Sequence, residues 1–357
     1  MRSWICLSLL CAFALLGTAV HAGEAAPAKK YKLLYISQSR GFMHGAVKRK
    51  APGVLAPSEV AVTQIGTESG LFDVECSQDA SIITPEKLKE LDAIMFYTTG
   101  DFDPKGEKGL PISEANFTAM MDWLKSGKAF IGTHSATDTL KNFKPYYELI
   151  NGSFNGHPWN AGDLCSFTNH EPTHPAMKMW EPEFQFKDEI YQYKNFDPKS
   201  VRVLMSLNME KCKTKMPWHV PVAWVRDVGE GRLFYTNLGH NESTWVDPKF
   251  QQHLLMGIRW ALKLENGPST PNPELHEAEE TKAIVATLAG AKQLVTDAAT
   301  AAGANADEAY AALEKLAKSD KEAFKKAFGA IDGAKGEKDP VKKKDRQTKA
   351  INDLLKK

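Results

Sequence analysis

The sequence predicts an α/β protein with a doubly wound, mainly parallel sheet, followed by a C-terminal all-α helical bundle. Short apolar runs alternate with amphipathic segments over the first two thirds of the chain, a Pro-rich segment then interrupts this pattern, and an Ala/Lys/Glu/Leu-rich region with helical spacing follows. Continuous apolar runs are typical of strands buried on both faces of a parallel sheet. Their alternation with helices predicts crossover connections on both faces.

The first half of the sheet is predicted from four apolar or alternating runs. The clearest is KLLYI at 32–36, and DAIMFYT at 92–98 has the same character. Between these runs, side chains suited to helix N-caps precede apolar residues spaced by three and four positions. Strands are expected at 32–36, 72–76, 92–98 and 129–131, with helices from Ser58 to Gly66, at 84–86, and from Ser113 to Gly127.

The second half of the domain begins with an irregular stretch. Residues 151–182 are rich in Gly, Pro, His and Trp, and long irregular segments within a compact domain usually line a site. Further on, a Gly229-Glu230-Gly231 turn predicts a hairpin, and Asp247-Pro248 predicts a helix start. Strands are expected at 183–193, 201–207, 220–228 and 232–237, followed by a helix to Ala261.

The chain divides into four predicted parts. Residues 1–22 have the features of a secretory signal: Arg2, an apolar run shorter than the roughly 20 residues that a membrane span needs, and a small-residue cleavage site. An α/β domain at 31–265, a Pro-rich linker at 266–276 and a helical tail at 277–357 follow. We expect a periplasmic or secreted protein with no membrane span after cleavage. We also expect few contacts across the linker, so that a cut after Glu265 leaves a folded domain.

Charge and cysteine content argue against nucleic-acid binding and against a disulfide framework. The formal net charge is +1, which gives no electrostatic case for nucleic acid. The lysines within 338–349 fit a solvated helix face, and the helical tail is a candidate surface for self-association or for a partner protein. Only Cys76, Cys165 and Cys212 follow the predicted cleavage site, which allows at most one disulfide.

The segment around His134 is the first candidate site. An apolar strand runs directly into Gly132-Thr133-His134-Ser135-Ala136. This spacing imitates the G-x-S-x-G nucleophile elbow, with an imidazole in place of the nucleophile. A strand-to-helix corner of this kind faces the crevice where α/β proteins bind ligands. The alternative is a histidine at an ordinary turn.

Two further histidines follow predicted strands in the same way. His44 lies just beyond the first strand and His240 just beyond the strand at 232–237, so we expect them to converge with His134 at one rim of the sheet. Asp101 also follows a strand. Three imidazoles could bind a divalent metal or supply acid and base near neutral pH. The spacing leaves both options open, and the cofactor remains undetermined with a divalent metal as a candidate.

An acidic pair and several tryptophans add to this set. Asp188 and Glu189 are adjacent, and adjacent strand residues point to opposite faces, so only one should face the site. Tyr191 follows two positions after Glu189. Trp245 lies close to His240, and an aromatic plane beside carboxylates suits a sugar ring.

Seven motifs follow one another along the chain: RGFMH at 40–44, GTHSA at 132–136, NGHP at 155–158, His174-Pro175, Asp188-Glu189-x-Tyr191, PVAW at 221–224, and Gly239-His240 with Trp245. In this order, over about residues 31–264, they resemble the ThuA-like (trehalose utilisation) family. The resemblance implies a class I glutamine amidotransferase-like, flavodoxin-type fold in which His134 replaces the amidotransferase cysteine. It also implies a link to sugar metabolism, with a carbohydrate or a keto-sugar derivative as the small-molecule substrate.

Three functions compete on this basis. The first is an exported carbohydrate-active hydrolase, lyase or isomerase in which a histidine removes a proton next to a sugar carbonyl or activates water. The second is a non-catalytic carbohydrate-binding module with a helical interaction tail. A Cys-dependent amidotransferase is disfavoured because position 134 is histidine. The candidate catalytic residues are His134, His44, His240, Glu189 and Asp188, and the candidate substrate-binding residues are Arg40, His157, His174, Tyr191, Trp245 and Asp101.

Overall fold

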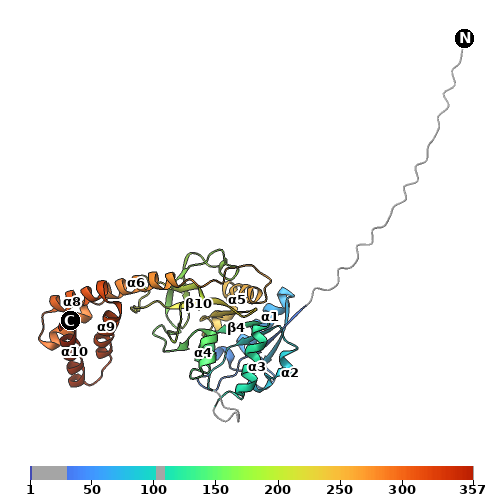
Figure 1. The fold of residues 1–357 in the computed structure, drawn as a ribbon, viewed down its shortest axis with the longest axis horizontal. Helices are drawn as coiled ribbons and strands as arrows, with labels where there is room; N and C mark the ends of the chain where they lie inside the picture. The colour runs from blue at the N-terminus through green and yellow to red at the C-terminus, as the bar shows by residue number, and fades with distance from the viewer. Residues whose placement is uncertain (2–29, 102–108, 357) are drawn as a thin grey trace.

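The computed structural model describes Met1 and residues 30–101 and 109–356. An α/β body is joined by the long helix α6 (Pro273–Gly290) to a lobe of helices at the C-terminus (Figure 1). Apart from Met1, the predicted signal segment lies outside the described residues. Across the described part of the chain, no helix is both long and apolar enough to cross a membrane.

A nine-stranded sheet forms the centre of the body, in the order β2-β1-β3-β4-β11-β10-β9-β6-β7. The first five strands in this order pair in parallel, and each later pairing is antiparallel. The predicted doubly wound sheet is therefore confirmed, with an antiparallel extension that includes the predicted β10–β11 hairpin. The strands are β1 (Tyr31–Ile36), β2 (Phe72–Ser77), β3 (Ala93–Phe96), β4 (Ala129–Thr133), β6 (Leu164–Asn169), β7 (Glu183–Lys187), β9 (Arg202–Leu207), β10 (Pro221–Val228) and β11 (Gly231–Thr236).

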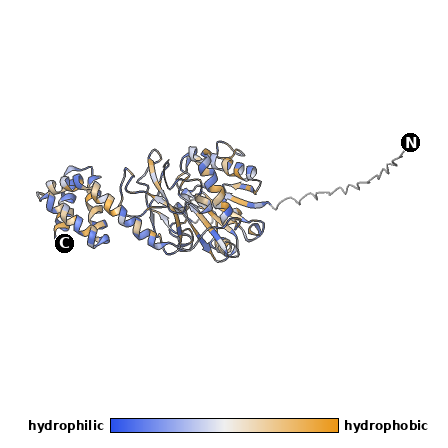
Figure 2. Cartoon of the chain, turned by 90° about the horizontal axis from the view of Figure 1, so that it is seen from above, coloured by the Kyte–Doolittle hydropathy of each residue, from blue (hydrophilic) through white to orange (hydrophobic). Residues whose placement is uncertain are grey.

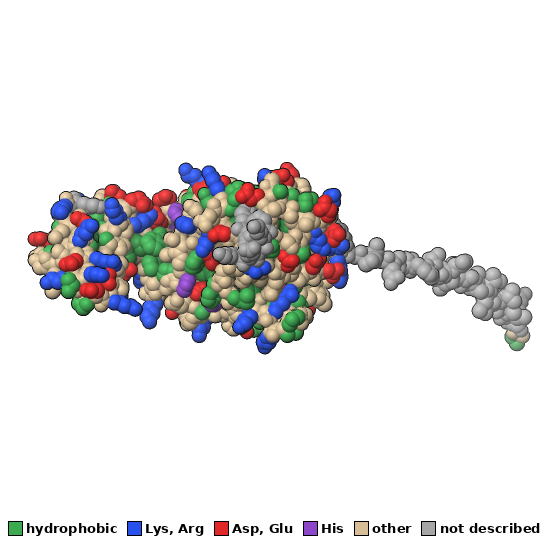
Figure 3. Space-filling view, turned by 90° about the horizontal axis from the view of Figure 1, so that it is seen from below, with side chains coloured by type: hydrophobic (Ala, Val, Ile, Leu, Met, Phe, Trp, Pro, Cys, Tyr) green, Lys and Arg blue, Asp and Glu red, His purple; other side chains and the backbone are tan. Residues whose placement is uncertain are grey.

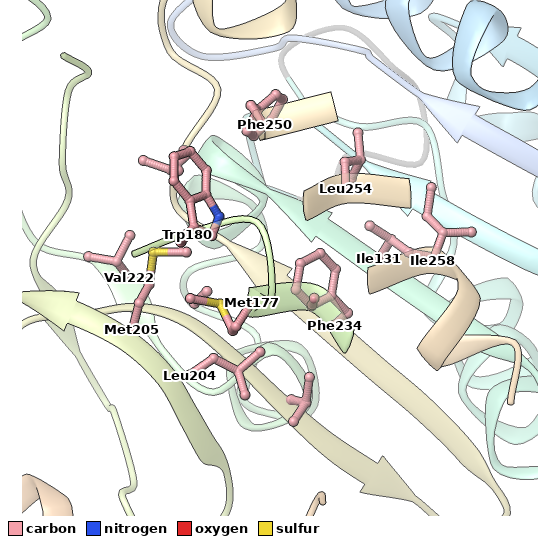
Figure 4. Packing of buried hydrophobic residues seen from close by; sticks show 14 of the residues in the cluster. Ile131, Met177, Trp180, Leu204, Met205, Val222, Phe234, Phe250, Leu254 and Ile258 are labelled. Carbon is pink, nitrogen blue, oxygen red and sulfur yellow. The ribbon is translucent and has the colours of Figure 1, made fainter. Parts of the chain in front are cut away.

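Helices cover both faces of the sheet because alternate strand residues point to opposite sides. In β1, Leu33 and Tyr35 belong to one hydrophobic cluster, and Leu34 and Ile36 belong to another. The first cluster includes α1 (Pro57–Ser69) and α5 (Pro248–Ala261); Figure 4 shows side chains of α5 beside Ile131 of β4. The second cluster includes α2 (Pro85–Leu88), α3 (Glu114–Lys125) and α4 (Lys144–Ile150).

One local expectation was wrong. The stretch 151–182 is not wholly irregular, because β6 pairs there with β7 and β9. These partners lie later in the chain, so β6 has little local signal. After β4 the chain forms a short 3-10 helix (His134–Asp138), so the strand-to-helix corner expected at His134 is present, and the short helix α4 follows from Lys144.

The segment 266–276 is packed against the body, which contradicts the expectation of few crossing contacts. Both ends of the Asn272 side-chain amide bond the backbone of Val203 in β9, at 2.8 Å to its N–H and 3.1 Å to its C=O. The indole of Trp260 donates to the carbonyl of Gly267. Ala283 and Ala286 of α6 are buried in the same cluster as the first sheet face. The part of α6 just past its middle thus packs into the body's core, and the proposed domain boundary stays a prediction.

The C-terminal lobe is a small helical bundle, as predicted. Figure 2 shows apolar and polar residues alternating around its helices, which is typical of amphipathic packing. Val295, Leu313, Phe324 and Ile351 lie in one buried cluster. On the face shown in Figure 3, acidic and basic side chains are interspersed. The helices are α7 (Lys292–Ala302), α8 (Ala306–Ser319), α9 (Lys321–Lys335) and α10 (Pro340–Leu355).

A buried histidine in α5 predicts loss of stability in mild acid. His253 donates from Nδ1 to the carbonyl of Ala176 (2.6 Å), and its Nε2 accepts from the hydroxyl of Thr236 (3.1 Å). Burial lowers its pKa from 6.5 to about 4. Because the unfolded imidazole takes up a proton first, the contribution of His253 is complete above pH 6.5 and is lost as the pH falls towards 4, by about 3 kcal/mol at most. Urea unfolding across this pH range should show a shallower dependence in His253→Gln, and an unchanged slope would contradict the prediction.

Candidate active site

Three histidines and one glutamate meet at the carboxyl rim of the parallel strands. The ring centroids of His44 and His134 lie 4.8 Å apart, and the centroid of His240 lies 5.1 Å from each. One ligand atom from each imidazole and one carboxylate oxygen of Glu189 lie within 4.8 Å of one another. The predicted convergence of the three histidines is confirmed. Their chemical roles stay predictions.

His134 lies at a strained corner of the backbone. Its φ of +41° is in the left-handed region, which is costly for a side chain other than glycine and which recurs at functional sites. Gly132 lets the strand pack closely there, because a Cβ at that position would lie 2.9 Å from the ring of Tyr235. The His134 carbonyl accepts a 2.7 Å hydrogen bond from the Tyr235 hydroxyl. Close packing at Gly132 and the hydrogen bond from Tyr235 thus hold the backbone at His134 in place.

Hydrogen bonding fixes the orientation of the His134 ring. Nδ1 lies 2.8 Å from the carbonyl oxygen of Asn237, which can only accept, so Nδ1 carries a proton. In the neutral imidazole the lone pair is then on Nε2. That atom lies 3.2 Å from Nδ1 of His240 and 3.5 Å from Oε2 of Glu189. The lone pair of His134 is therefore directed into the cluster.

Glu189 lies between the buried part of the cluster and an exposed histidine. Its Oε2 lies 2.9 Å from Nδ1 of His240, and its Oε1 lies 3.2 Å from Nδ1 of His157. Burial raises the pKa of this carboxyl, but the neighbouring imidazoles of His134 and His240 outweigh burial and hold the pKa well below its usual range. His157 is 44% exposed, whereas Glu189 is buried. His157 is therefore the solvent-facing partner of the carboxylate.

His44 is buried beside Tyr191. Its Nε2 lies 3.1 Å from the Tyr191 hydroxyl, and its Nδ1 is buried without a hydrogen-bond partner. Burial, followed by the neighbouring His134 and His240, lowers the pKa of His44 to about 2. The ring is neutral at pH 7 and retains a nitrogen for a ligand.

Only one carboxylate of the adjacent pair joins the cluster, as expected: Asp188 does not, and both of its oxygens are already bonded. Oδ2 accepts from the Gly239 N–H (2.7 Å) and from the Thr244 hydroxyl (3.0 Å). Oδ1 accepts from the N–H groups of Asn241 (2.9 Å) and Glu189 (3.1 Å). The geometry does not favour the catalytic role expected for Asp188. It favours a positioning role, since these bonds hold the loop that carries His240.

Two of the predicted substrate-binding residues lie in the interior. His174 accepts from the Ala176 N–H and packs 5.6 Å from Trp260, so the structure does not bring it to the cluster. Trp245 is 1% exposed, donates to the Gly239 carbonyl and stacks on Tyr97 at 5.8 Å. No open ring face is left for a sugar. Both corrections arise because sequence position cannot separate a core aromatic ring from one at a surface.

Arg40 and Asp101 lie on an exposed edge near the first strands. Arg40 donates from its backbone N–H to the Thr99 carbonyl, and Asp101 accepts from the Asn142 amide. Neither makes a direct contact with the four-residue cluster among the interactions described. Their proposed substrate-binding roles stay predictions.

Sequence reasoning missed two residues that support the cluster. Asn237 accepts from His134 with its carbonyl, and its side chain bonds both the N–H (3.3 Å) and the C=O (3.1 Å) of Tyr191. The buried hydroxyl of Tyr97 donates to the Gly239 carbonyl at 2.9 Å. Both residues lie at the carboxyl ends of predicted strands, and this position is the sequence feature that could have identified them.

One family model and several solved structures match this chain. The family model described as ThuA, trehalose utilisation, matches residues 45–261. A protein from Bacteroides uniformis described as ThuA-like is 19% identical, with a TM-score of 0.52 over 71% of this chain and 99% of the other. A second, from Parabacteroides merdae, is 17% identical, with a TM-score of 0.50 over 69% and 99%. These identities establish a shared fold alone. No curated protein matches the chain. The family match spans more than half of the chain, so this protein belongs to the ThuA family.

Proposed function

We propose that this ThuA-family chain is an exported enzyme that acts on a carbohydrate or a keto-sugar derivative, as a hydrolase, lyase or isomerase. Its active centre would be His44, His134, Glu189 and His240, assembled around a divalent metal of the zinc type. The single observation behind the proposal is the convergence of these three imidazoles and one carboxylate within 4.8 Å.

The donor set suits such an ion. Zinc takes imidazole nitrogens and carboxylate oxygens, usually four in total, and a catalytic site keeps one position open. A metal-ligating histidine usually donates its other ring N–H to a backbone carbonyl or a carboxylate, as Nδ1 of His134 does to Asn237. The unpartnered Nδ1 of His44 would also gain a partner if it faces the ion. A bound ion of this kind polarises carbonyls and lowers the pKa of water.

The residues around the centre suit proton transfer and sugar binding. His157 bonds Glu189 and is exposed to solvent, so it can move a proton between the substrate and water. Phe42 is 65% exposed and lies edge-on to His44 at 4.8 Å. An exposed aromatic face beside polar groups suits a sugar ring. The trehalose utilisation name of the family and the signal-like N-terminus support the sugar link and the export.

Metal analysis of the purified full chain tests this proposal. We expect about one zinc-type ion per chain, a strong loss of metal in Glu189→Gln and His240→Ala, and retention in the control His170→Gln, whose ring bonds Ser206 outside the cluster. Disaccharides and their keto derivatives would then be screened for turnover. Turnover that persists without metal would favour histidine acid/base chemistry alone. Tight sugar binding with no turnover would favour the binding module.

A further inference from the structure

A second cluster of histidines lies where α6 meets the sheet, and the proposed centre does not use it. A cavity of about 210 Å³ opens there, beside the first residue of β10, Pro221. Tyr193 of the short strand β8 (Tyr193–Lys194), Trp218 and His276 of α6 line it. Since β10 runs antiparallel to β11, its start lies at the same rim as His240. We propose that this cavity binds a neutral sugar ring.

The cavity carries polar groups that have no protein partner. Nδ1 of His219 lies 3.0 Å from Nδ1 of His276, so one of these atoms donates and the other accepts. The remaining nitrogen of His219, a residue only 5% exposed, is buried without a partner, and so is the Oε1 of Gln192, which also lines the cavity. Buried polar atoms are normally satisfied, and both atoms are closed to solvent, so a ligand's hydroxyl group or an ordered water would reach them once the Gln192 amide or the His219 ring turns toward the cavity.

The chemistry of the lining identifies the class of ligand. No Asp, Glu, Lys or Arg side chain lines the cavity, which gives a charged ligand no counter-charge. Aromatic rings, amides and imidazoles are present together, and a sugar ring offers an apolar face and hydroxyl groups to match them. A metal fits less well, because across the described residues only the His44 cluster gathers three or more metal-binding side chains. Burial lowers the pKa of both His219 and His276, which keeps the pair uncharged at neutral pH.

Tyr193 connects the cavity to the active centre. Its hydroxyl bonds the amide of Asn237 and lies 3.2 Å from the hydroxyl of Tyr235. Tyr235 donates to the His134 carbonyl, and Asn237 accepts from the His134 ring. A ligand against Tyr193 therefore contacts a residue that supports the elbow. The cavity would act as a second sugar subsite on the same rim.

Calorimetric titration of the full chain with trehalose and with glucose tests the second subsite. Only the choice of these probes rests on the proposed function. We expect Trp218→Ala and His276→Ala to weaken binding at the cavity at least tenfold, and His240→Ala to leave that binding in place. Trp123→Phe, a change in α3, is the matched control. Because Trp218 also packs on the core, Trp218→Ala could lose binding by unfolding, so tryptophan fluorescence of the unaltered chain is a second measurement. The chain has eight tryptophans, and we expect sugar to shift the emission of the unaltered chain but not that of Trp218→Phe.

The outcomes separate the two proposals. If His240→Ala abolishes all binding and the cavity variants bind normally, the subsite is wrong and the sugar site is the histidine centre. If the cavity variants alone lose binding, the subsite stands and sugar binding at the centre is in doubt. Absence of any heat or fluorescence change at millimolar probe overturns the subsite.

Discussion

Replacing His134 by alanine should lower turnover of the sugar substrate by a factor on the order of 10² to 10⁴. The ring lies at a fixed corner, so its lone pair reaches the cluster without an entropic cost of orientation. Because the ring is fully buried and bonds Asn237, the same change should also lower the free energy of unfolding, by about 1 to 3 kcal/mol. Steady-state kinetics, metal content and urea unfolding of the same preparation measure the three effects.

His134→Gln separates chemistry from packing. The amide can keep a hydrogen bond to Asn237, but it is a much weaker metal ligand than an imidazole and cannot take a proton near pH 7. We expect most of the stability to return while turnover stays low. Near-full activity in His134→Gln would reduce His134 to an orienting group and direct attention to His44 or His240. If both variants lose stability and activity in proportion, the role of His134 is structural.

Cutting the chain after Glu265 should destabilise the α/β body severely, contrary to the expectation from the linker's composition. The cut removes Asn272 and leaves the N–H and C=O of Val203 without their partner, which alone costs about 2 to 6 kcal/mol if both stay buried. It also uncovers the part of the core that Ala283 and Ala286 cover. Total stabilities of domains are only about 5 to 15 kcal/mol. Melting of the 23–265 fragment should therefore occur far below that of the full chain, or the fragment should be insoluble.

A fragment that ends after Gly290 is the matched control. It keeps α6 and removes the four later helices, whose core is a separate cluster to which α6 contributes Ile284. We expect the 23–290 fragment to melt close to the α/β transition of the full chain. Equal melting of the 23–265 and 23–290 fragments would show that α6 adds nothing to the body.

Most of the parallel sheet could be predicted because its signals are local. A run such as 32–36 is apolar throughout, and Ser113 and Asp247 cap the helices that follow them by bonding Asn116 and Phe250. β6 could not be predicted with the same certainty, because its stability depends on strands that come later in the chain. The packing of α6 on the α/β body could not be predicted for a similar reason. A Pro-rich composition indicates a turn or linker, but it does not say which surface the segment contacts.

Local patterns in the chain were enough to predict the fold class, the elbow at His134 and the rim at which His44 and His240 join it, since each histidine follows a strand of one parallel unit. Which neighbouring side chains face the centre depends on the folded arrangement. Glu189 enters the cluster while Asp188 holds a loop, and His174 lies in the core, because side-chain direction depends on packing partners distant in the chain. Periodicity is a property of adjacent residues, whereas a site is a property of residues that meet only after folding.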